Sequence, residues 1–355
     1  MVTEETLQRL AALRELIDRR TGPGRWLILT HDNPDPDALA AAAALSTLLR
    51  EGFARRVTTA YGGIIGRAEN RQMVKTLRVK PSQVKHLNWG HYKHYALVDC
   101  QPGTGNNALP ESLVPDLVLD HHPIRRATRS ALLTDVRTHY GATATIACEY
   151  LLASGITIDR SLATALVYAI RSETQDFGRE YSEHDKSIYD LLHAQADLRA
   201  LARIQFPSLP ISYFRTLRRA VANLSTVDSL VVSHLGEVEQ PDIVPEIADL
   251  LLRLEGKTWS LTSGSFEDRL YLSMRTTNPR ADAGRLMRRL LGRRGRGGGH
   301  GMIAGGWVAL ARSEGGAAVQ LHRQLATRLA SLLKKSPERL APVPGLLEPS
   351  PEVGV

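Results

Sequence analysis

One segment near the N-terminus constrains the fold of this chain more than any other. Its apolar residues 26–29 predict a buried strand, and its alanine-rich residues 38–50 predict a buried helix. Between them lies the run HDNPDPD at residues 31–37, in which Pro34 and Pro36 stiffen the turn. A strand, a loop and a helix in this order form the unit from which parallel sheets are built. The segment therefore predicts an α/β fold with polar side chains at the end of the first strand.

The same pattern recurs at two later strands. An apolar run at 95–98 ends at Asp99, and another at 117–119 leads into the Asp-His-His triplet at 120–122. In open parallel sheets the carboxyl ends of the strands form the edge where ligands bind. Carboxylates combined with imidazole suit Mn²⁺ or Mg²⁺, and such an ion can bind a phosphate and activate water. The three strand ends together favour a metal site.

Each motif alone also has a plain structural explanation. Acidic residues and prolines are common in turns, so residues 31–37 alone are equally compatible with a loop that caps the following helix. The triplet at 120–122 could be a surface turn with two solvated histidines. Charged and titratable side chains are rarely gathered in a protein interior unless they are paired or bind a metal, and this favours the metal site.

Composition limits the class of protein. A chain of 355 residues with 43% hydrophobic and 23% charged residues is long enough for two globular domains, and its net charge of +8 favours anionic partners. Two cysteines without a CxxC motif indicate a reducing compartment and no zinc knuckle. No GxSxG motif points to a serine nucleophile. With no signal peptide and no apolar stretch of bilayer length, we expect a cytoplasmic protein that does not bind membranes.

In order along the chain, these motifs resemble those of the DHH phosphoesterase superfamily. The segments that carry the resemblance are His31-x-x-Pro34-Asp35-Pro36-Asp37, Val98-Asp99, Asp120-His121-His122 and Ser172-Glu173-Thr174. A later run, Gly297-Gly298-Gly299-His300 with Ala304-Gly305-Gly306, is similar to the DHH-associated C-terminal domain. The resemblance spans about residues 20–335 and favours the nanoRNase/pAp phosphatase-like branch.

The resemblance implies a two-domain α/β architecture with the active site in the cleft between the domains. We expect an N-terminal parallel-sheet DHH catalytic domain over 1–190 and a helical linker over 191–214. A smaller α/β domain over 215–335 would bind substrate, and a proline-rich tail over 336–355 would be disordered. The glycine run at 295–301 is expected to form a loop that can approach an anion closely.

The resemblance also implies two Mn²⁺ ions per chain, with Mg²⁺ as the alternative. His31 and Asp35 would hold one ion, Asp37 and His121 the other, and Asp99 would bridge them. Two ions at such a site can hold a hydroxide between them and polarise a phosphoryl oxygen.

The sixth ligand departs from the family pattern. The family has an aspartate there, and this sequence has Glu173, with Asp176 as the alternative ligand. His122 would contact the substrate phosphate, and Asp120 would orient His121. In the second domain the expected substrate-binding residues are Arg275, Gly298, Gly299 and His300.

The predicted function is the hydrolysis of short single-stranded oligonucleotides (nanoRNA) or pAp-like nucleotides by a metal-bound hydroxide. A cyclic-dinucleotide phosphodiesterase, a RecJ-like single-strand exonuclease and a non-catalytic nucleotide- or RNA-binding protein remain alternatives. An inorganic pyrophosphatase shares the first-domain motifs, but the Gly-Gly-Gly-His run argues against it. Homodimers are frequent in the family, so a homodimer is an open expectation.

Overall fold

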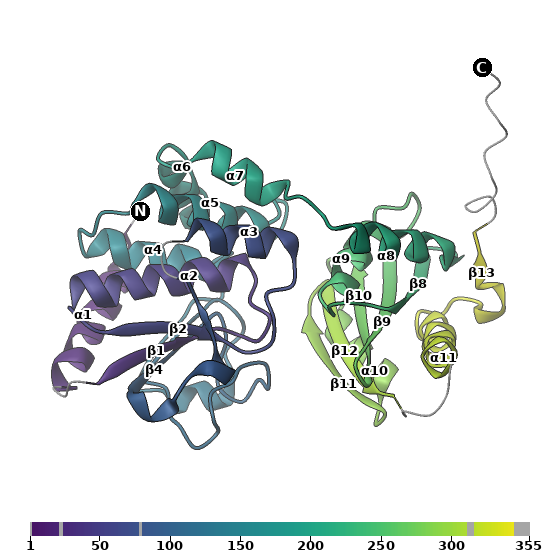
Figure 1. Cartoon of the computed structure of the whole chain (residues 1–355), viewed down its shortest axis with the longest axis horizontal. Coiled ribbons are helices and arrows are strands. Elements are labelled where there is room, and N and C mark those ends of the chain that lie inside the picture. Colours follow the sequence, from purple (N-terminus) through teal and green to yellow (C-terminus); the bar gives the residue numbers. More distant parts are fainter. Residues whose placement is uncertain (1, 21–23, 78–79, 311–315, 344–355) are drawn as a thin grey trace. The chain divides into compact units, whose positions relative to one another are not determined.

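The computed structural model describes residues 2–20, 24–77, 80–310 and 316–343. The chain forms two compact units, residues 1–208 and 209–355, and each has its own sheet and hydrophobic core (Figure 1). The α/β fold with a parallel sheet in the first unit, predicted from the sequence, is confirmed.

The first unit contains a six-stranded sheet in the order β3-β2-β1-β4-β5-β6, and every pairing in it is parallel. Its strands are β1 (Arg25–Leu29), β2 (Val57–Tyr61), β3 (Ser82–Gln83), β4 (Tyr92–Val98), β5 (Leu117–Asp120) and β6 (Leu133–Val136). From β1 the chain continues to β2 on one side, and the later strands β4 and β5 lie on the other side. The carboxyl ends of β1, β4 and β5 are therefore neighbours at the point where the strand order reverses, which is where ligands bind in such sheets.

Helices cover one face of this sheet, and α2 runs along it in Figure 1. They are α1 (Glu4–Arg19), α2 (Pro36–Thr47), α3 (Ala68–Thr76), α4 (Thr143–Ala153), α5 (Arg160–Glu173), α6 (Glu183–His193) and α7 (Leu198–Gln205). Asp35 caps the N-terminus of α2, and Pro36 occupies its first turn, where proline costs no hydrogen bond. The alanines of α2 are buried and let α4 and α5 pack closely against it. α2 continues as a π-helical turn over Leu48–Gly52.

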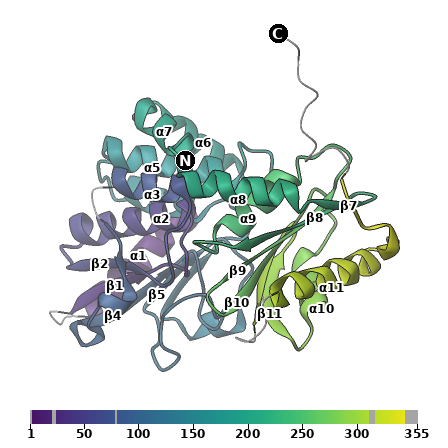
Figure 2. The ribbon, with the colours of Figure 1, turned by 45° about the vertical axis from the view of Figure 1, so that its right-hand side comes forward.

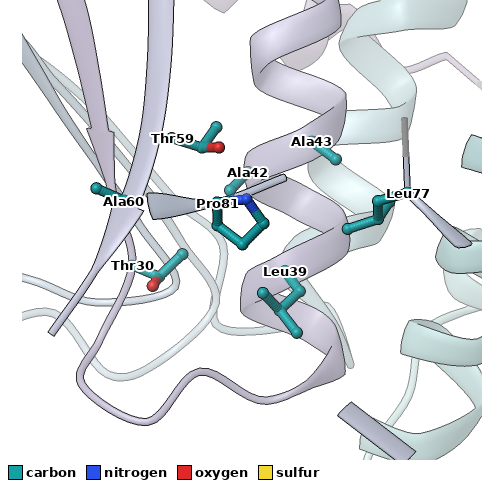
Figure 3. A pocket seen from close by; sticks show the side chains of 8 residues that line it. All are labelled: Thr30, Leu39, Ala42, Ala43, Thr59, Ala60, Leu77 and Pro81. Atoms are coloured by element: carbon teal, nitrogen blue, oxygen red, sulfur yellow. The ribbon is translucent and has the colours of Figure 1, made fainter. Parts of the chain in front are cut away.

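The opposite face of the sheet is covered by loops and by three short 3₁₀-helices, Val84–His86, Trp89–His91 and Arg126–Ser130. Between α2 and the strands β1 and β2 lies a gap of about 10 Å³, lined mostly by apolar side chains (Figure 3). A space of this size holds one water molecule at most. It is therefore a packing defect and not a site for a substrate.

The second unit has a seven-stranded mixed sheet in the order β11-β12-β10-β9-β8-β7-β13. Its strands are β7 (Ser225–Val227), β8 (Leu230–Glu237), β9 (Trp259–Phe266), β10 (Arg269–Thr276), β11 (Gly295–His300), β12 (Ile303–Ala309) and β13 (Ala341–Pro342). Its helices are α8 (Ile211–Ala222), α9 (Ile243–Leu251), α10 (Ala283–Leu291) and α11 (Ala317–Leu332). One core lies between the sheet and the helix pair α8 and α9, and a second lies between the sheet and the pair α10 and α11 (Figure 2).

The glycine run corrects one expectation. It forms the edge strand β11, paired antiparallel with β12, and not a loop. A Cβ atom added to Gly284 of α10 would overlap the carbonyl oxygen of Gly299, so glycine lets the helix lie directly on the strand. A Cβ at Gly298 would meet nothing within 4 Å.

The segment 191–214, expected to be a linker, is divided between the two units. α7 packs against α3 and α5 of the first unit, and α8 packs against β8 of the second. Disorder was expected from residue 336 onwards, but β13 pairs with β7, so this expectation is wrong for residues 337–342. Residues 344–355 lie outside the described part of the chain. Within the described residues, no helix has the length and apolarity needed to cross a bilayer.

Candidate metal centre

The loop after β1 carries the first two candidate ligands. The Nδ1 atom of His31 lies 2.8 Å from the backbone carbonyl oxygen of Asp32. A carbonyl oxygen can only accept, so Nδ1 holds the proton and Nε2 is directed away from this bond. The Nε2 atom lies 3.7 Å from Oδ1 of Asp35 and 3.5 Å from Oδ2 of Asp99. Burial lowers the pKa of His31, but the attraction of these two nearby carboxylates outweighs burial and raises it well above its ordinary value.

Asp37 is fully buried in the first turn of α2. Its two carboxylate oxygens accept hydrogen bonds from the backbone N–H groups of Thr143 and Ala144, at 2.8 and 2.7 Å. These groups belong to the N-terminus of α4, where the helix dipole favours an anion. Burial and the neighbouring carboxylates, first among them Asp99, nevertheless raise the pKa of Asp37 well above its ordinary value. The local structure therefore fixes the position of a carboxylate that still lacks compensating positive charge.

Asp99 lies at the centre of the cluster. It directly follows β4, is 3% exposed and has a left-handed backbone with φ of 58°. Such a conformation is costly for a residue with a Cβ atom and often marks a functional site. Its Oδ1 atom accepts a hydrogen bond of 2.9 Å from the Thr143 hydroxyl. The same atom lies 3.8 Å from Nε2 of His121 and 3.6 Å from Nδ1 of His122.

The two histidines after β5 have different partners, and this corrects one expectation. The Nδ1 atom of His121 lies 3.2 Å from the backbone oxygen of Tyr140, which leaves its Nε2 atom facing Asp37 and Asp99. The buried carboxylate of Asp120 accepts a hydrogen bond of 2.8 Å from the ring Nδ1 of His122. From His121 it accepts a hydrogen bond from the backbone N–H and none from the ring. Asp120 therefore orients the ring of His122 and not that of His121.

Glu173, the last residue of α5, is half-buried near the cluster. Burial, with the negative charges of Asp35 and Asp99, raises its pKa to about 7, although His121 opposes the shift. Asp176, the alternative ligand, has 68% of its side chain exposed and forms an ion pair with Arg171. Glu173 is therefore the better candidate, since its pKa responds to the charges of the cluster, whereas Asp176 is exposed and paired with Arg171.

These residues fit a centre for two divalent cations. Two groups, His31 with Asp35 and Asp99, and Asp99 with His121 and His122, each bring donor atoms within 4.8 Å of one another and share Asp99. Separations of 3.5 to 3.9 Å between the imidazole nitrogens and the carboxylates are too long for hydrogen bonds.

Two further observations support this fit. Among the described residues, Nε2 of His121 is a buried nitrogen without a hydrogen-bond partner. The raised pKa values of Asp37 and Glu173 express a repulsion that bound cations would offset. The oxygen and nitrogen donors suit Mn²⁺ or Mg²⁺.

The sequence reasoning missed the groups that support the cluster. Gln101 donates to the free oxygen of Asp120 and accepts from the Thr128 hydroxyl and the backbone N–H of Arg125. The segment 140–144 contributes mostly backbone groups, which leave no signature in a sequence. One feature of the sequence could have pointed to Gln101: it lies two residues after Asp99, just beyond the end of the same strand.

A buried ionic network lies behind the segment 140–144. The guanidinium of Arg137, with none of its side chain exposed, pairs with Asp135 at 2.8 Å and with Glu149 at 3.0 Å. The hydroxyl of Tyr140 donates to Glu149 at 2.9 Å. The residue whose carbonyl holds His121 is thus itself fixed by buried charges.

The second unit corrects the expected role of Arg275. Its side chain, at the end of β10, is 8% exposed and pairs with Asp249 at 2.7 Å. It also donates to the backbone oxygens of Met274 and Ala304. This guanidinium is used inside the fold, so the expectation of an open phosphate clamp is wrong. Gly298 and Gly299 lie on β11, and the side chain of His300 is outside the described part of the structure.

Comparison with known proteins agrees with this geometry. The model of the DHH family N-terminal domain matches residues 25–170, and the model of the DHHA1 domain matches residues 228–326. An uncharacterized protein of Methanocaldococcus jannaschii is 35% identical over 308 residues, which is 86% of this chain and 62% of that protein. The chain thus spans less than two thirds of the length of this relative.

Two further similarities were found. A probable manganese-dependent inorganic pyrophosphatase of Bacillus cereus is 26% identical over 234 residues, covering 60% of this chain and 75% of that protein. The crystal structure of an exopolyphosphatase-related protein from Bacteroides fragilis superposes with a TM-score of 0.69 at 13% identity. It covers 92% of this chain and 98% of that one, and it shows that the fold is shared.

Proposed function

We propose that this chain, which carries the N-terminal domain of the DHH family and a DHHA1 domain, is a metal-dependent phosphoesterase. The observation that carries the proposal is the position of Asp99, whose two carboxylate oxygens lie near different histidines: Oδ2 is 3.5 Å from Nε2 of His31 and Oδ1 is 3.8 Å from Nε2 of His121. A carboxylate shared in this way is what a two-metal hydrolytic site requires.

In this proposal His31 and Asp35 hold one cation, and Asp37 and His121 hold the other, with Asp99 common to both. Glu173 is the sixth ligand, since it is the acidic side chain at the end of α5 that faces the cluster charges. When bound, two Mn²⁺ ions would supply a hydroxide nucleophile and polarise a phosphoryl oxygen. Manganese is favoured over magnesium because a relative of this chain is named as a manganese-dependent enzyme.

The proposed role of His122 is to donate a hydrogen bond to the substrate phosphate. Burial lowers its pKa, but the hydrogen bond to Asp120 and the charges of Asp99 and Asp120 raise it to about 9. Because Nδ1 is held by Asp120, a protonated ring carries its second proton on Nε2. Bound cations would lower the pKa of this ring, and the substrate phosphate would raise it. A protonated Nε2 can donate to an anionic oxygen and stabilise the charge that develops on it.

We propose short oligonucleotides or pAp-like nucleotides as substrates. The motif order and the net charge of +8, which favours anionic ligands, support this choice. Inorganic pyrophosphate is the second candidate, because a sequence relative is named as a pyrophosphatase. In both cases the reacting group is a phosphoryl centre.

A substrate panel with a matched pair of variants tests the proposal. Purified protein with Mn²⁺ is offered dinucleotides, 5-mers, pAp, cyclic di-AMP and pyrophosphate, and bound metal is counted by mass spectrometry. Asp99→Asn should lower turnover by about a thousandfold or more, because it removes the carboxylate shared by both metals. Asp176→Asn removes a nearby carboxylate outside the cluster and should leave turnover unchanged. Hydrolysis of none of the substrates, or equal effects of the two variants, would refute the proposal.

A further inference from the structure

A second cavity lies within the second unit, apart from the acidic cluster. Its volume is about 450 Å³, which is in the range of small-molecule sites. It is bounded by β8, by α11, by the end of α8 and by the segment 337–342. All of the residues that line it belong to the second unit.

Two buried histidines and a serine form a chain at the wall of this cavity. The Nδ1 atom of His234 on β8 lies 2.9 Å from the hydroxyl of Ser263 on β9. The same hydroxyl lies 2.8 Å from Nδ1 of His322 on α11. The two rings are 5.4 Å apart between centroids and are tilted by 30°. Both histidines are 6% exposed and line the cavity.

Proton counting gives the two rings opposite hydrogen-bonding character. Burial lowers the pKa of His234, and burial together with the charges of His234 and Arg323 lowers that of His322 to about 3, so both rings are neutral at neutral pH. A hydroxyl has one proton, so Ser263 donates to one ring and accepts from the other. The ring that accepts at Nδ1 has its proton on Nε2, and the ring that donates at Nδ1 has a lone pair on Nε2. One Nε2 atom is therefore a donor and the other an acceptor.

These two nitrogens are available to a ligand. In the described part of the chain no hydrogen bond involves Nε2 of His234 or of His322, and neither nitrogen is among the fully buried polar atoms that lack a partner. A buried polar atom without a partner is costly, so a donor and an acceptor at a cavity wall favour a ligand or ordered water there.

The charges of the residues that line the cavity limit which ligands it can bind. Arg323, one residue after His322, is exposed and lines the cavity, and none of the described lining residues carries a carboxylate. Apolar side chains such as Val232, Val319 and Leu340 complete the walls. The surroundings therefore suit a flat apolar body with polar atoms at one edge and a negative charge near the guanidinium.

We propose that this cavity binds a small heterocycle with adjacent donor and acceptor atoms on one edge and an anionic substituent, which is the chemistry of a nucleoside monophosphate. The base edge would meet the histidine pair, and the phosphate would meet Arg323. This site is additional to the proposed phosphoesterase centre, because it shares no residue with it.

Calorimetric titration in EDTA tests the proposal without turnover at the metal centre. The probes are AMP, GMP, CMP and UMP, each compared with its nucleoside. We expect at least one nucleotide to bind, and His322→Leu and Ser263→Ala to weaken it by about tenfold or more, as expected for lost hydrogen bonds. His31→Ala should leave binding unchanged, since His31 belongs to the other site.

The exposed Arg323 gives a variant that does not depend on the core. Arg323→Ala should reduce nucleotide affinity to that of the nucleoside and leave nucleoside binding unchanged. If His322→Leu does not fold, as judged by circular dichroism, Arg323→Ala alone decides. The proposal is overturned if no nucleotide binds below about 5 mM, a range within reach of weak small-molecule sites. It is equally overturned if the His322, Ser263 and Arg323 variants bind like the wild type, or if His31→Ala abolishes binding.

Discussion

Replacing Arg137 by methionine should destabilise the first unit strongly. The guanidinium is fully buried between β6 and α4 and makes a bidentate contact with Asp135 at 2.8 and 2.9 Å. It also donates hydrogen bonds to Glu149, Tyr140 and Thr6. Methionine is similar in length but has no charge and no donor, so the change leaves two carboxylates in the core without their cation.

The loss of stability depends on which hydrogen bonds the two carboxylates keep in the variant. Asp135 keeps the hydrogen bond from the hydroxyl of Tyr150. Glu149 keeps those from the hydroxyls of Tyr140 and Thr6, and the ring of His184 lies 3.3 Å away, so neither carboxylate becomes wholly unpaired. Removing one member of a buried ion pair costs about 3–5 kcal/mol. At about 2–4 °C per kcal/mol for a unit of this size, the melting temperature should fall by roughly 6–20 °C. A buried carboxylate that has lost its cation is neutralised by taking up a proton, so the loss of stability should be smaller at acidic than at alkaline pH.

Urea unfolding followed by circular dichroism at acidic and at alkaline pH measures this loss. Arg171→Met is the matched control, because Arg171 pairs with a carboxylate whose side chain is 68% exposed, and it should cost less than about 1 kcal/mol. Glu149→Gln in the Arg137→Met background should restore part of the stability, since it removes one uncompensated charge. A loss below about 1 kcal/mol for Arg137→Met, or a loss that does not depend on pH, would refute the reasoning.

Three further outcomes are expected. Removing metal with EDTA should lower the melting temperature of the wild type, because a ligand that binds only the folded state stabilises that state. The melting temperature of Asp99→Asn should change little. Equal changes in the two proteins would contradict the shared role of Asp99. The pKa of Glu173 is raised to about 7, so protons compete with the cation for this carboxylate below that pH. In titrations Mn²⁺ should therefore bind more weakly at pH 6 than at pH 8. Glu173→Gln should reduce this difference. Gly284→Ala should destabilise the second unit by about 1–3 kcal/mol in thermal unfolding, since its Cβ overlaps the adjacent strand, whereas Gly298→Ala should stay close to wild type; similar effects of the two alanines would contradict the packing argument.

The sequence predicted the central strands of the first sheet and the side chains that converge at their ends. Each motif follows an apolar run, and parallel strands place their carboxyl ends at one edge, so local patterns were enough to bring His31, Asp37, Asp99 and His121 together. The type of side chain and its place at a strand end decide this part of the site.

Features that depend on backbone geometry or on distant pairing could not be predicted. The ring partner of Asp120 is set by the turn between residues 120 and 122, because that turn places the ring of His122 at the carboxylate. The glycine run has no side chains to signal a strand, and its pairing with β12 makes it one. Arg275 was expected in a binding role because of its place at a strand end, but its partner Asp249 lies in α9, far away in the sequence.

The segment 140–144 holds the centre together with main-chain atoms. The carbonyl of Tyr140 orients His121, and the amides of Thr143 and Ala144 hold Asp37. Peptide groups are the same in every residue except proline, so these hydrogen bonds do not use the side chain of Ala144, although that side chain is fully buried and leaves room only for a small residue. A bulky residue at position 144 would therefore loosen the hold on Asp37 by displacing two amides, and the centre would be damaged without the loss of any ligand.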